Sequence, residues 1–292
     1  MTEQCREIIR RHSRPLAPLP TGQRPLLRRV APLNAVLFDV YGTLLISGSG
    51  EIGVNGPAAG GVTIVEALAA VGLRLAGPGA EASAVFFGQI ADEHARARRV
   101  GVEFPEVDII QVWRSVLAEF AARGWIAGNA GVDPAALAVE FEVRANPLWT
   151  MPNLVPTLTG LRSAGLTLGV VSNAQFYTPE AFPALVGQSL TELGFADDLL
   201  FYSYRHGQAK PGVALYRLAV QALQLRGIPP QRALYVGNDL RNDIGPAARL
   251  GFRTALFAGD ARSLRLRPGD PRCAGVVPDL VVTDLRELLD CL

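Results

Sequence analysis

Lysine is almost absent from this chain. Lysine and arginine together number 28, and Lys210 is the only lysine among them. A lysine carries a compact point charge with rotatable donors, whereas an arginine presents a broad planar fork, so the two are not interchangeable. A chance surface lysine is the simpler interpretation when Lys210 is considered alone. Three further segments, described below, make it a candidate functional residue.

The chain also lacks long apolar runs, has few cysteines and carries almost no net charge. No run approaches the roughly 18 apolar residues of a membrane-spanning helix. A net charge of +1 gives no electrostatic reason to expect nucleic acid as a partner. The three cysteines, Cys5, Cys273 and Cys291, lack the spacing of metal or redox sites, which is typical of a reducing compartment. We therefore expect a cytoplasmic protein with no membrane partner.

Short apolar runs recur along the chain from Asn34 onward. Runs of this length are typical of strands that are buried on both faces, as in a parallel sheet. Helical patterns separate them, which predicts βαβ units and an α/β fold with a doubly wound parallel sheet. At 292 residues with 49% hydrophobic content, the chain is long enough to bury such a core. The predicted strands span residues 35–38, 166–171, 199–202, 233–236, 254–257 and 280–282.

Helical spacing of apolar residues interrupts this alternation between the first and second predicted strands. The spacing is clearest within residues 62–71, 109–120 and 137–143. Asp133 and Pro134 have the types expected at the N-cap and the first position of the last of these helices. We predict an inserted α-helical cap that lies over the strand ends, and we place hinges near Gly53 and Pro147–Pro156.

The first thirty residues differ from the rest in composition. They are rich in arginine and proline, and they lack the apolar stretch of a secretory signal. We interpret residues 1–33 as an N-terminal extension, either loose or docked. The predicted core then comprises residues 34–55 and 148–292, and the cap comprises residues 56–147.

Four segments carry residues suited to catalysis, and each follows a predicted strand or precedes a helix. In the first, Asp39 ends a strand and a glycine turn follows it, so its carboxylate is placed to enter a cleft as a covalent nucleophile. A strand-ending aspartate that only shapes the turn is the alternative. In the second, Ser172 and Asn173 follow a strand and have groups that hold an anionic oxygen, although ordinary loops share this pattern.

The third segment contains Lys210 and the fourth is acidic. A fixed ammonium at Lys210 would keep Asp39 deprotonated and neutralise an anionic substrate. Tyr216, six residues later, either faces the same site or packs within its helix. Asp239 and Asp243 lie four residues apart and fall on one face if that stretch is helical. Oxygen ligands of this kind suit Mg²⁺, while acids that favour a helix N-terminus are the alternative.

In this order, the four segments resemble the haloacid dehalogenase superfamily, with a first motif of the Asp-x-Tyr-Gly-Thr type. The resemblance covers roughly Asn34 to Leu288. It implies a Rossmann-like core, a helical cap and an aspartyl-enzyme intermediate on Asp39, with Lys210 balancing charge. It implies substrate contacts from Thr43, Ser172, Asn173 and Tyr216. It also implies Mg²⁺ ligands from Asp39, the backbone carbonyl of Tyr41, and Asp239 or Asp243.

Tyr41 departs from the pattern of the superfamily's phosphatases. These usually have a second aspartate two residues after the nucleophile, which protonates the departing alkoxide and then activates water. A phenol has a pKa of about 10 and is a poor base near neutrality. Tyrosine at this position resembles the 2-haloacid dehalogenase branch, in which the leaving halide needs no proton. Tyr216 agrees with that branch as well.

The fourth segment favours the phosphatases instead. Asn238 and Leu240 stand where the dehalogenase branch usually has a serine and an asparagine that position water. The additional acid, Asp239, is costly beside Asp243 unless a cation compensates it. A bound Mg²⁺ would do so, and a phosphate dianion needs such a cation more than a monoanionic carboxylate does.

Three functional hypotheses remain open from sequence. The first is a Mg²⁺-dependent hydrolase of a small phosphate ester or anhydride, with Tyr41, a cap residue or solvent as acid and base. The second is a metal-independent 2-haloacid dehalogenase, or a hydrolase of a similar small acid, again acting through Asp39. The third is a non-catalytic binding module of the same fold. All three take a small anionic partner. The oligomeric state is not fixed by the sequence, and a homodimer is one option.

Overall fold

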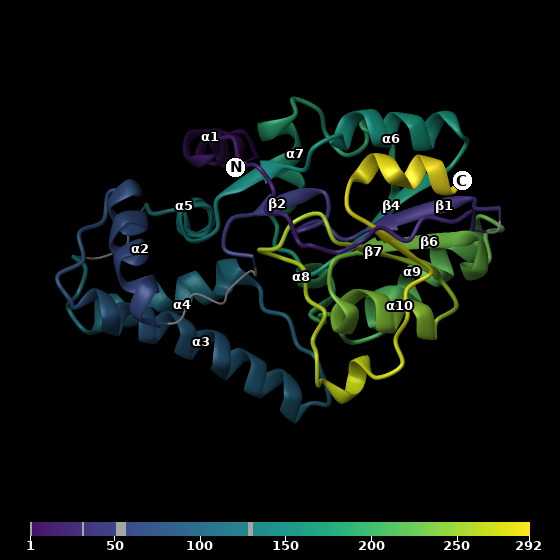
Figure 1. Ribbon diagram of the computed structural model, residues 1–292. Helices are drawn as coiled ribbons and strands as arrows, with labels where there is room; N and C mark the ends of the chain where they lie inside the picture. The colour runs from purple at the N-terminus through teal and green to yellow at the C-terminus, as the bar shows by residue number, and fades with distance from the viewer. Residues whose placement is uncertain (1, 31, 51–56, 128–130) are drawn as a thin grey trace.

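The computed structural model describes residues 2–30, 32–50, 57–127 and 131–292 (Figure 1). Its centre is a sheet of six parallel strands in the order β5-β4-β1-β6-β7-β8. All six predicted strands are confirmed, and only β5 begins clearly earlier than expected. The strands are β1 (Ala35–Phe38), β4 (Thr167–Ser172), β5 (Phe195–Tyr202), β6 (Ala233–Gly237), β7 (Arg253–Phe257) and β8 (Leu280–Val282).

Helices cover both faces of this sheet, which explains why the strands are apolar throughout. In β1, Val36 and Phe38 pack into one core cluster, whereas Ala35 and Leu37 pack into another on the opposite face. Helix α6 (Leu154–Ser163) and helix η4 (Leu285–Cys291) cover the first face, and helices α9 (Ala214–Leu225) and α10 (Gly245–Arg249) cover the second (Figure 1). The predicted α/β fold with a doubly wound, Rossmann-like sheet is confirmed.

Among the described residues, four helices form an insert between β1 and α6, and they have a core of their own around Trp113 and Phe120. Apolar spacing identified three of them and missed α3, whose sequence is polar and rich in alanine. The predicted N-cap is confirmed, since the carboxylate of Asp133 accepts a hydrogen bond from the amide of Ala135 at 2.9 Å. These helices are α2 (Pro57–Ala70), α3 (Gly79–Arg99), α4 (Ile109–Ala122) and α5 (Pro134–Ala145).

The insert joins the core through a two-stranded antiparallel sheet of β2 (Leu45–Ser47) and β3 (Leu148–Thr150). Helix α5 contributes side chains both to the core of the insert and to the main core. The boundaries of a separate cap domain stay a prediction. The hinge predicted at Gly53 lies outside the described residues.

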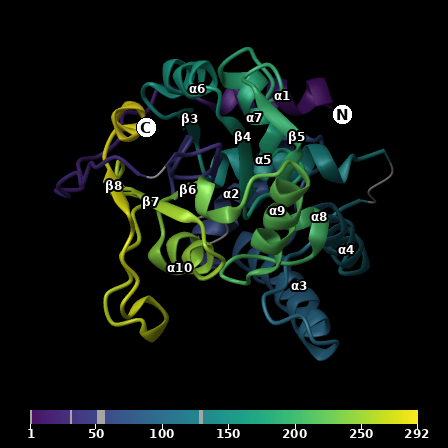
Figure 2. The same ribbon diagram turned by 90° about the vertical axis from the view of Figure 1, so that its right-hand side faces the viewer.

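The N-terminal extension is docked. Helix α1 (Thr2–His12) packs against α5 and α7 (Thr178–Leu185), as Figures 1 and 2 show from two sides. Cys5, Ile8 and Ile9 recur at helical spacing and are buried, which fixes this face of α1 on the protein. The chain then runs along the edge strand β8, where the amide of Leu26 donates to the carbonyl of Val281 at 2.8 Å.

The remaining short helices connect these elements. These short helices are α8 (Ser203–His206), η1 (Pro230–Arg232), η2 (Leu240–Ile244) and η3 (Pro271–Cys273). No helix in the described ranges combines the length and apolar character required to cross a membrane.

Candidate active site

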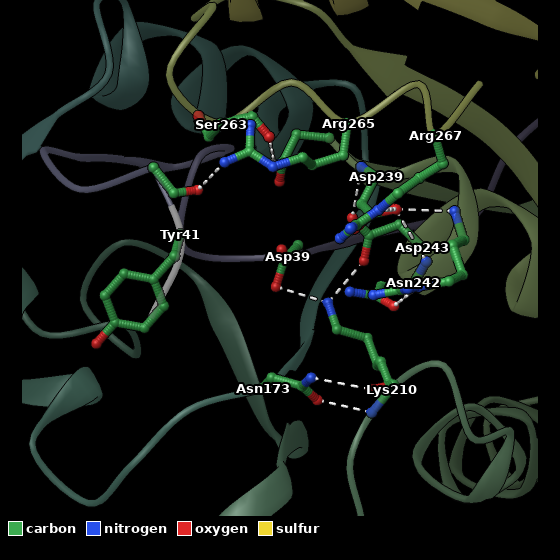
Figure 3. A pocket seen from close by; sticks show the side chains of 13 residues that line it. Asp39, Tyr41, Asn173, Lys210, Asp239, Asn242, Asp243, Ser263, Arg265 and Arg267 are labelled. Carbon is green, nitrogen blue, oxygen red and sulfur yellow. Dashed lines mark hydrogen bonds and ion pairs between the residues drawn. The ribbon is translucent and has the colours of Figure 1, made fainter. Parts of the chain in front are cut away.

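The predicted catalytic segments meet at the carboxyl ends of β1, β4 and β6, around a cavity of about 380 Å³ (Figure 3). This is where open α/β sheets bind their ligands. The cavity is lined by three carboxylates, those of Asp39, Asp239 and Asp243. Four cationic side chains line it as well: Lys210, Arg241, Arg265 and Arg267. Cationic side chains at the wall of a cavity suit an anionic ligand.

Lys210 connects the first and fourth segments. Its Nζ lies 2.8 Å from Oδ1 of Asp39 and 2.6 Å from Oδ1 of Asp243. Burial alone would lower the pKa of Lys210, but the carboxylates of Asp243 and Asp39 raise it above its ordinary value. The ammonium is therefore charged at neutral pH and keeps the carboxylate of Asp39 in contact with it.

Asp243 is the most enclosed of the charged residues described at the site, with 1% of its surface exposed. Burial raises the pKa of its carboxyl, and the neighbouring carboxylates of Asp39 and Asp239 add to that rise, while Lys210 opposes it. Its Oδ2 accepts a hydrogen bond from the amide of Asp239 at 2.9 Å. Asp243 thus positions both the lysine and the start of helix η2.

Asn173 holds the backbone of Lys210 from the opposite side. Its Oδ1 accepts from the amide of Lys210 at 2.7 Å, and its Nδ2 donates to the carbonyl of Lys210 at 3.1 Å (Figure 3). Asn173 also lines the cavity. Ser172 does not, because its side chain is fully buried and its Oγ donates to the carbonyl of Asn173. The predicted contact between Ser172 and substrate is not supported by this placement.

Tyr41 points its ring away from the cavity, so the prediction that its phenol serves in catalysis is not supported (Figure 3). The hydroxyl is 2.8 Å from Oγ1 of Thr178, and burial raises the pKa of Tyr41 well above its ordinary value. The following turn is tight. Gly42 has φ +81°, and a Cβ there would lie 2.5 Å from the Cβ of Ser263, which explains the glycine.

Thr43 and Tyr216 lie next to the site but outside the lining of its cavity. Both are fully buried and neither lines the cavity. The hydroxyl of Thr43 donates to Oδ1 of Asn238 at 3.1 Å, and that of Tyr216 donates to the carbonyl of Asn242 at 2.8 Å. They support the first and fourth segments, because the polar end of each side chain is used by the protein itself. The predicted substrate contacts of both residues are not supported.

Arg267 is a site residue that the sequence analysis missed. Its Nη2 lies 2.6 Å from Oδ2 of Asp239, and its Nε lies 3.3 Å from Oδ1 (Figure 3). It belongs to the loop between β7 and β8, which also brings Ser263 and Arg265 to the cavity. This loop could not be identified as part of the site from the sequence, because it has no apolar periodicity and arginine is common throughout the chain.

The carboxylates that were predicted to hold Mg²⁺ already have protein partners. Asp239 accepts from Arg267 and from the amides of Arg241 and Asn242. Both oxygens of Asp243 are used, by Lys210 and by the amide of Asp239. No group of three histidine, cysteine or acidic residues within the described ranges is placed to hold a metal ion. This arrangement does not fit Mg²⁺, and Arg267 supplies the compensating charge that the sequence analysis assigned to the metal.

Comparison with known proteins agrees with this geometry. A family model described as haloacid dehalogenase-like hydrolase matches residues 33–251. A glyceraldehyde 3-phosphate phosphatase of Methanopyrus kandleri is 29% identical over 169 residues, which are 55% of this chain and 66% of that protein. A ribulose-1,5-bisphosphate 5-phosphatase of Halopiger xanaduensis is 28% identical over 142 residues, 48% of this chain and 55% of that protein. The matches thus span less than two thirds of each of these relatives.

Solved structures show the same fold. A 2-haloacid dehalogenase from Pseudomonas syringae pv. Tomato DC3000 has a TM-score of 0.54 and 19% identity, over 88% of this chain and 96% of that one. The defluorinating L-2-haloacid dehalogenase Rha0230 has a TM-score of 0.51 and 18% identity, over 94% and 98%. With the family match across most of its length, the chain belongs to the haloacid dehalogenase-like hydrolases and is an enzyme of that family.

Proposed function

We propose that this protein hydrolyses a small phosphate ester or anhydride through a covalent intermediate on Asp39. The observation that carries the proposal is the contact of Lys210 with both Asp39 and Asp243 in a cavity with additional arginines. That contact holds the ammonium of Lys210 beside the carboxylate that would attack, and the cationic groups that line the cavity attract a dianion. The names of the two curated relatives, both phosphatases, support the same substrate class.

In the proposed reaction a carboxylate oxygen of Asp39 bonds to phosphorus as the bond between phosphorus and the leaving oxygen breaks. Lys210 and the arginines that line the cavity stabilise the charge on the phosphoryl oxygens. Water then attacks the phosphorus of the aspartyl phosphate, which releases inorganic phosphate and restores Asp39.

The position of Tyr41 narrows the choice of leaving group. Its hydroxyl is bonded to Thr178 and turned from the cavity, so it does not protonate a departing alkoxide. We therefore favour leaving groups of low basicity. Aryl and acyl phosphates and anhydrides have such leaving groups, whereas an alcohol would take its proton from a cap residue or from solvent.

Mg²⁺ dependence is the part of the expectation that the donor arrangement does not support. Lys210 and Arg267 already compensate the carboxylates, so the proposed reaction takes no step through the metal. Mg²⁺ would have to displace Arg267 in order to bind Asp239. A cytoplasmic location and a homodimeric assembly stay predictions.

A 2-haloacid dehalogenase is the second candidate, and Tyr41 is the observation that favours it. A halide leaves without a proton, so the missing acid two residues after Asp39 costs that reaction nothing. The same carboxylate would attack carbon instead of phosphorus. A non-catalytic binding module is not supported, since the chain belongs to a family of hydrolases.

One panel separates these candidates. Phosphate release from p-nitrophenyl phosphate and chloride release from 2-chloropropionate are each measured with Mg²⁺ and with chelator, using Asp39→Asn as the control. We expect phosphate release that needs Asp39 and persists in chelator. Chloride release without phosphate release would establish the second candidate in place of the first.

A further inference from the structure

A second cavity, of about 280 Å³, adjoins the active site. Asn173 lines both cavities, so the two cavities lie against a common residue. The second cavity lies between helices α3 and α5 of the insert and the segment that follows β4. A leaving group that extends past Asn173 from a phosphate on Asp39 would enter it. The inference below therefore rests on the proposed phosphate hydrolysis.

Aromatic rings form much of the wall of this cavity. Phe86, Phe87, Phe141 and Tyr177 all line it, and the ring centroids of Phe86 lie 5.3 Å from Phe87 and 4.8 Å from Phe141. An aromatic wall accepts an apolar ligand body. The faces of such rings also attract a cation, and groups of them are a recurrent binding site for ammonium ions.

Two carboxyl groups line the same wall. Glu106 accepts hydrogen bonds from the hydroxyl of Ser203 at 2.7 Å, the amide of Val107 at 3.0 Å and the side-chain amide of Gln175 at 3.2 Å. Every one of these donors is neutral. Burial raises the pKa of Glu106, because nothing around it favours the charged form strongly enough to offset the loss of water.

Glu142, like Glu106, is enclosed and has only neutral hydrogen-bond partners among the described residues. Its partners are the side-chain amide of Asn146 at 3.4 Å and the hydroxyl of Tyr177, and burial raises its pKa as well. No lysine, arginine or charged histidine of the described residues pairs with either glutamate. His94 lines the cavity, but burial and the nearby Arg98 lower its pKa, so it is neutral at pH 7.

These features are complementary to a cation that the protein does not supply. Two enclosed carboxyl groups without a counter-charge are unfavourable, and glutamine would make comparable neutral hydrogen bonds without that cost. We propose that the second cavity binds an ammonium group carried by the leaving group, so that the substrate is a small phosphate ester of an amino alcohol. The positive charge also makes the leaving oxygen less basic than that of an uncharged alcohol.

The test compares phosphocholine with 3,3-dimethylbutyl phosphate, its uncharged isostere. Binding of each to the Asp39→Asn protein is measured by calorimetry, and hydrolysis of each is measured with the unmodified enzyme. We expect phosphocholine to bind about tenfold more tightly and to have a correspondingly higher kcat/KM. Equal binding and equal turnover of the two esters would overturn the inference while leaving phosphate hydrolysis intact.

Substitution of the two glutamates tests whether they cause the preference for phosphocholine over its uncharged isostere. Glu106→Gln and Glu142→Gln keep the shape of the side chain. Each is expected to reduce severalfold the ratio of kcat/KM for phosphocholine to kcat/KM for 3,3-dimethylbutyl phosphate, without altering inhibition by inorganic phosphate. Glu119→Gln, on the exposed face of α4, is the matched control and should leave the ratio unchanged. A ratio that is unaffected by both cavity variants would contradict the proposal.

A phosphate-free probe separates the two proposals. Benzyltrimethylammonium should bind the unmodified protein, and the Glu142→Gln variant should bind it more weakly. If it binds in this way and no phosphate ester is hydrolysed, the cation site stands and the proposed function fails. If phosphate esters are hydrolysed and the probe does not bind, the cation site fails and the proposed function stands.

Discussion

Nζ of Lys210 lies 2.8 Å from Asp39 and 2.6 Å from Asp243, so the only lysine of the chain bridges two buried carboxylates. An ammonium fits between two oxygens at these distances because its three donors surround one nitrogen. A guanidinium spreads its donors over a plane and is larger. This contact explains why a chain that otherwise uses arginine retains a lysine at this position.

Lys210→Arg should therefore lose most activity although the charge is conserved. We expect kcat/KM to fall about 100-fold, comparable to the loss of one essential stabilising donor in other enzymes. The measurement is steady-state hydrolysis of p-nitrophenyl phosphate. Arg226→Lys, in an ion pair with Asp198 that is partly exposed, is a matched exchange and should have no effect. Near-normal activity of Lys210→Arg would show that the bridge is not required.

Tyr41→Phe should leave catalysis almost unchanged. The hydroxyl contacts Thr178 and is turned from the cavity, so its removal takes one buried hydrogen bond from the fold and nothing from the reaction. We expect kcat/KM within about threefold of normal and a free energy of unfolding lower by about 1 kcal/mol. Urea denaturation and the hydrolysis assay measure the two quantities. A loss of activity without a loss of stability would show that the hydroxyl of Tyr41 takes part in catalysis.

Arg267→Ala should make the protein more responsive to Mg²⁺. Removing the guanidinium leaves Asp239 beside Asp243 without its closest cation, and a divalent ion can then take that place. We expect Mg²⁺ to raise the Tm of the variant more than that of the unmodified protein. Arg272→Ala, which breaks a pair with Asp270 that is partly exposed, is the control. If Mg²⁺ raises the Tm of Arg267→Ala and of the unmodified protein equally, Arg267 does not occupy a position that Mg²⁺ can take.

Asp243 should make stability depend on pH in a defined direction. Burial raises the pKa of its carboxyl from 3.8 to about 7, so the folded state holds this proton more tightly than the unfolded state does. Its contribution to stability is therefore full below pH 3.8 and is lost as the pH rises through about 7. Asp243→Asn cannot titrate, so its stability relative to the unmodified protein should improve as pH increases over this window. Urea denaturation at several pH values measures the difference, and a constant difference would contradict the expected titration.

The fold and the centre of the site were predictable because they follow from local patterns. Buried strands are short apolar runs, and the segments that follow parallel strands meet at one edge of the sheet, which brings Asp39, Lys210 and Asp243 together. The predicted substrate contacts of Thr43, Ser172 and Tyr216 are not supported by the placement of their side chains. These residues belong to the right segments, but whether a side chain faces the cavity or the core depends on its orientation there.

The remaining site residues have no local signal. Arg267 reaches Asp239 from an irregular loop, and only the folded chain brings the two together. Glu106 and Glu142 look like ordinary surface acids in the sequence. They become enclosed only when the insert packs against the segment after β4, so their burial is a tertiary property.

The central claim is that Asp39 becomes esterified during turnover, and mass spectrometry of the acid-quenched enzyme tests it most directly. After a brief reaction with p-nitrophenyl phosphate, the peptide that contains residue 39 should carry one phosphoryl group in the unmodified protein and none in Asp39→Asn. Continued phosphate release by Asp39→Asn at the normal rate, with no modified peptide in either protein, would contradict this account.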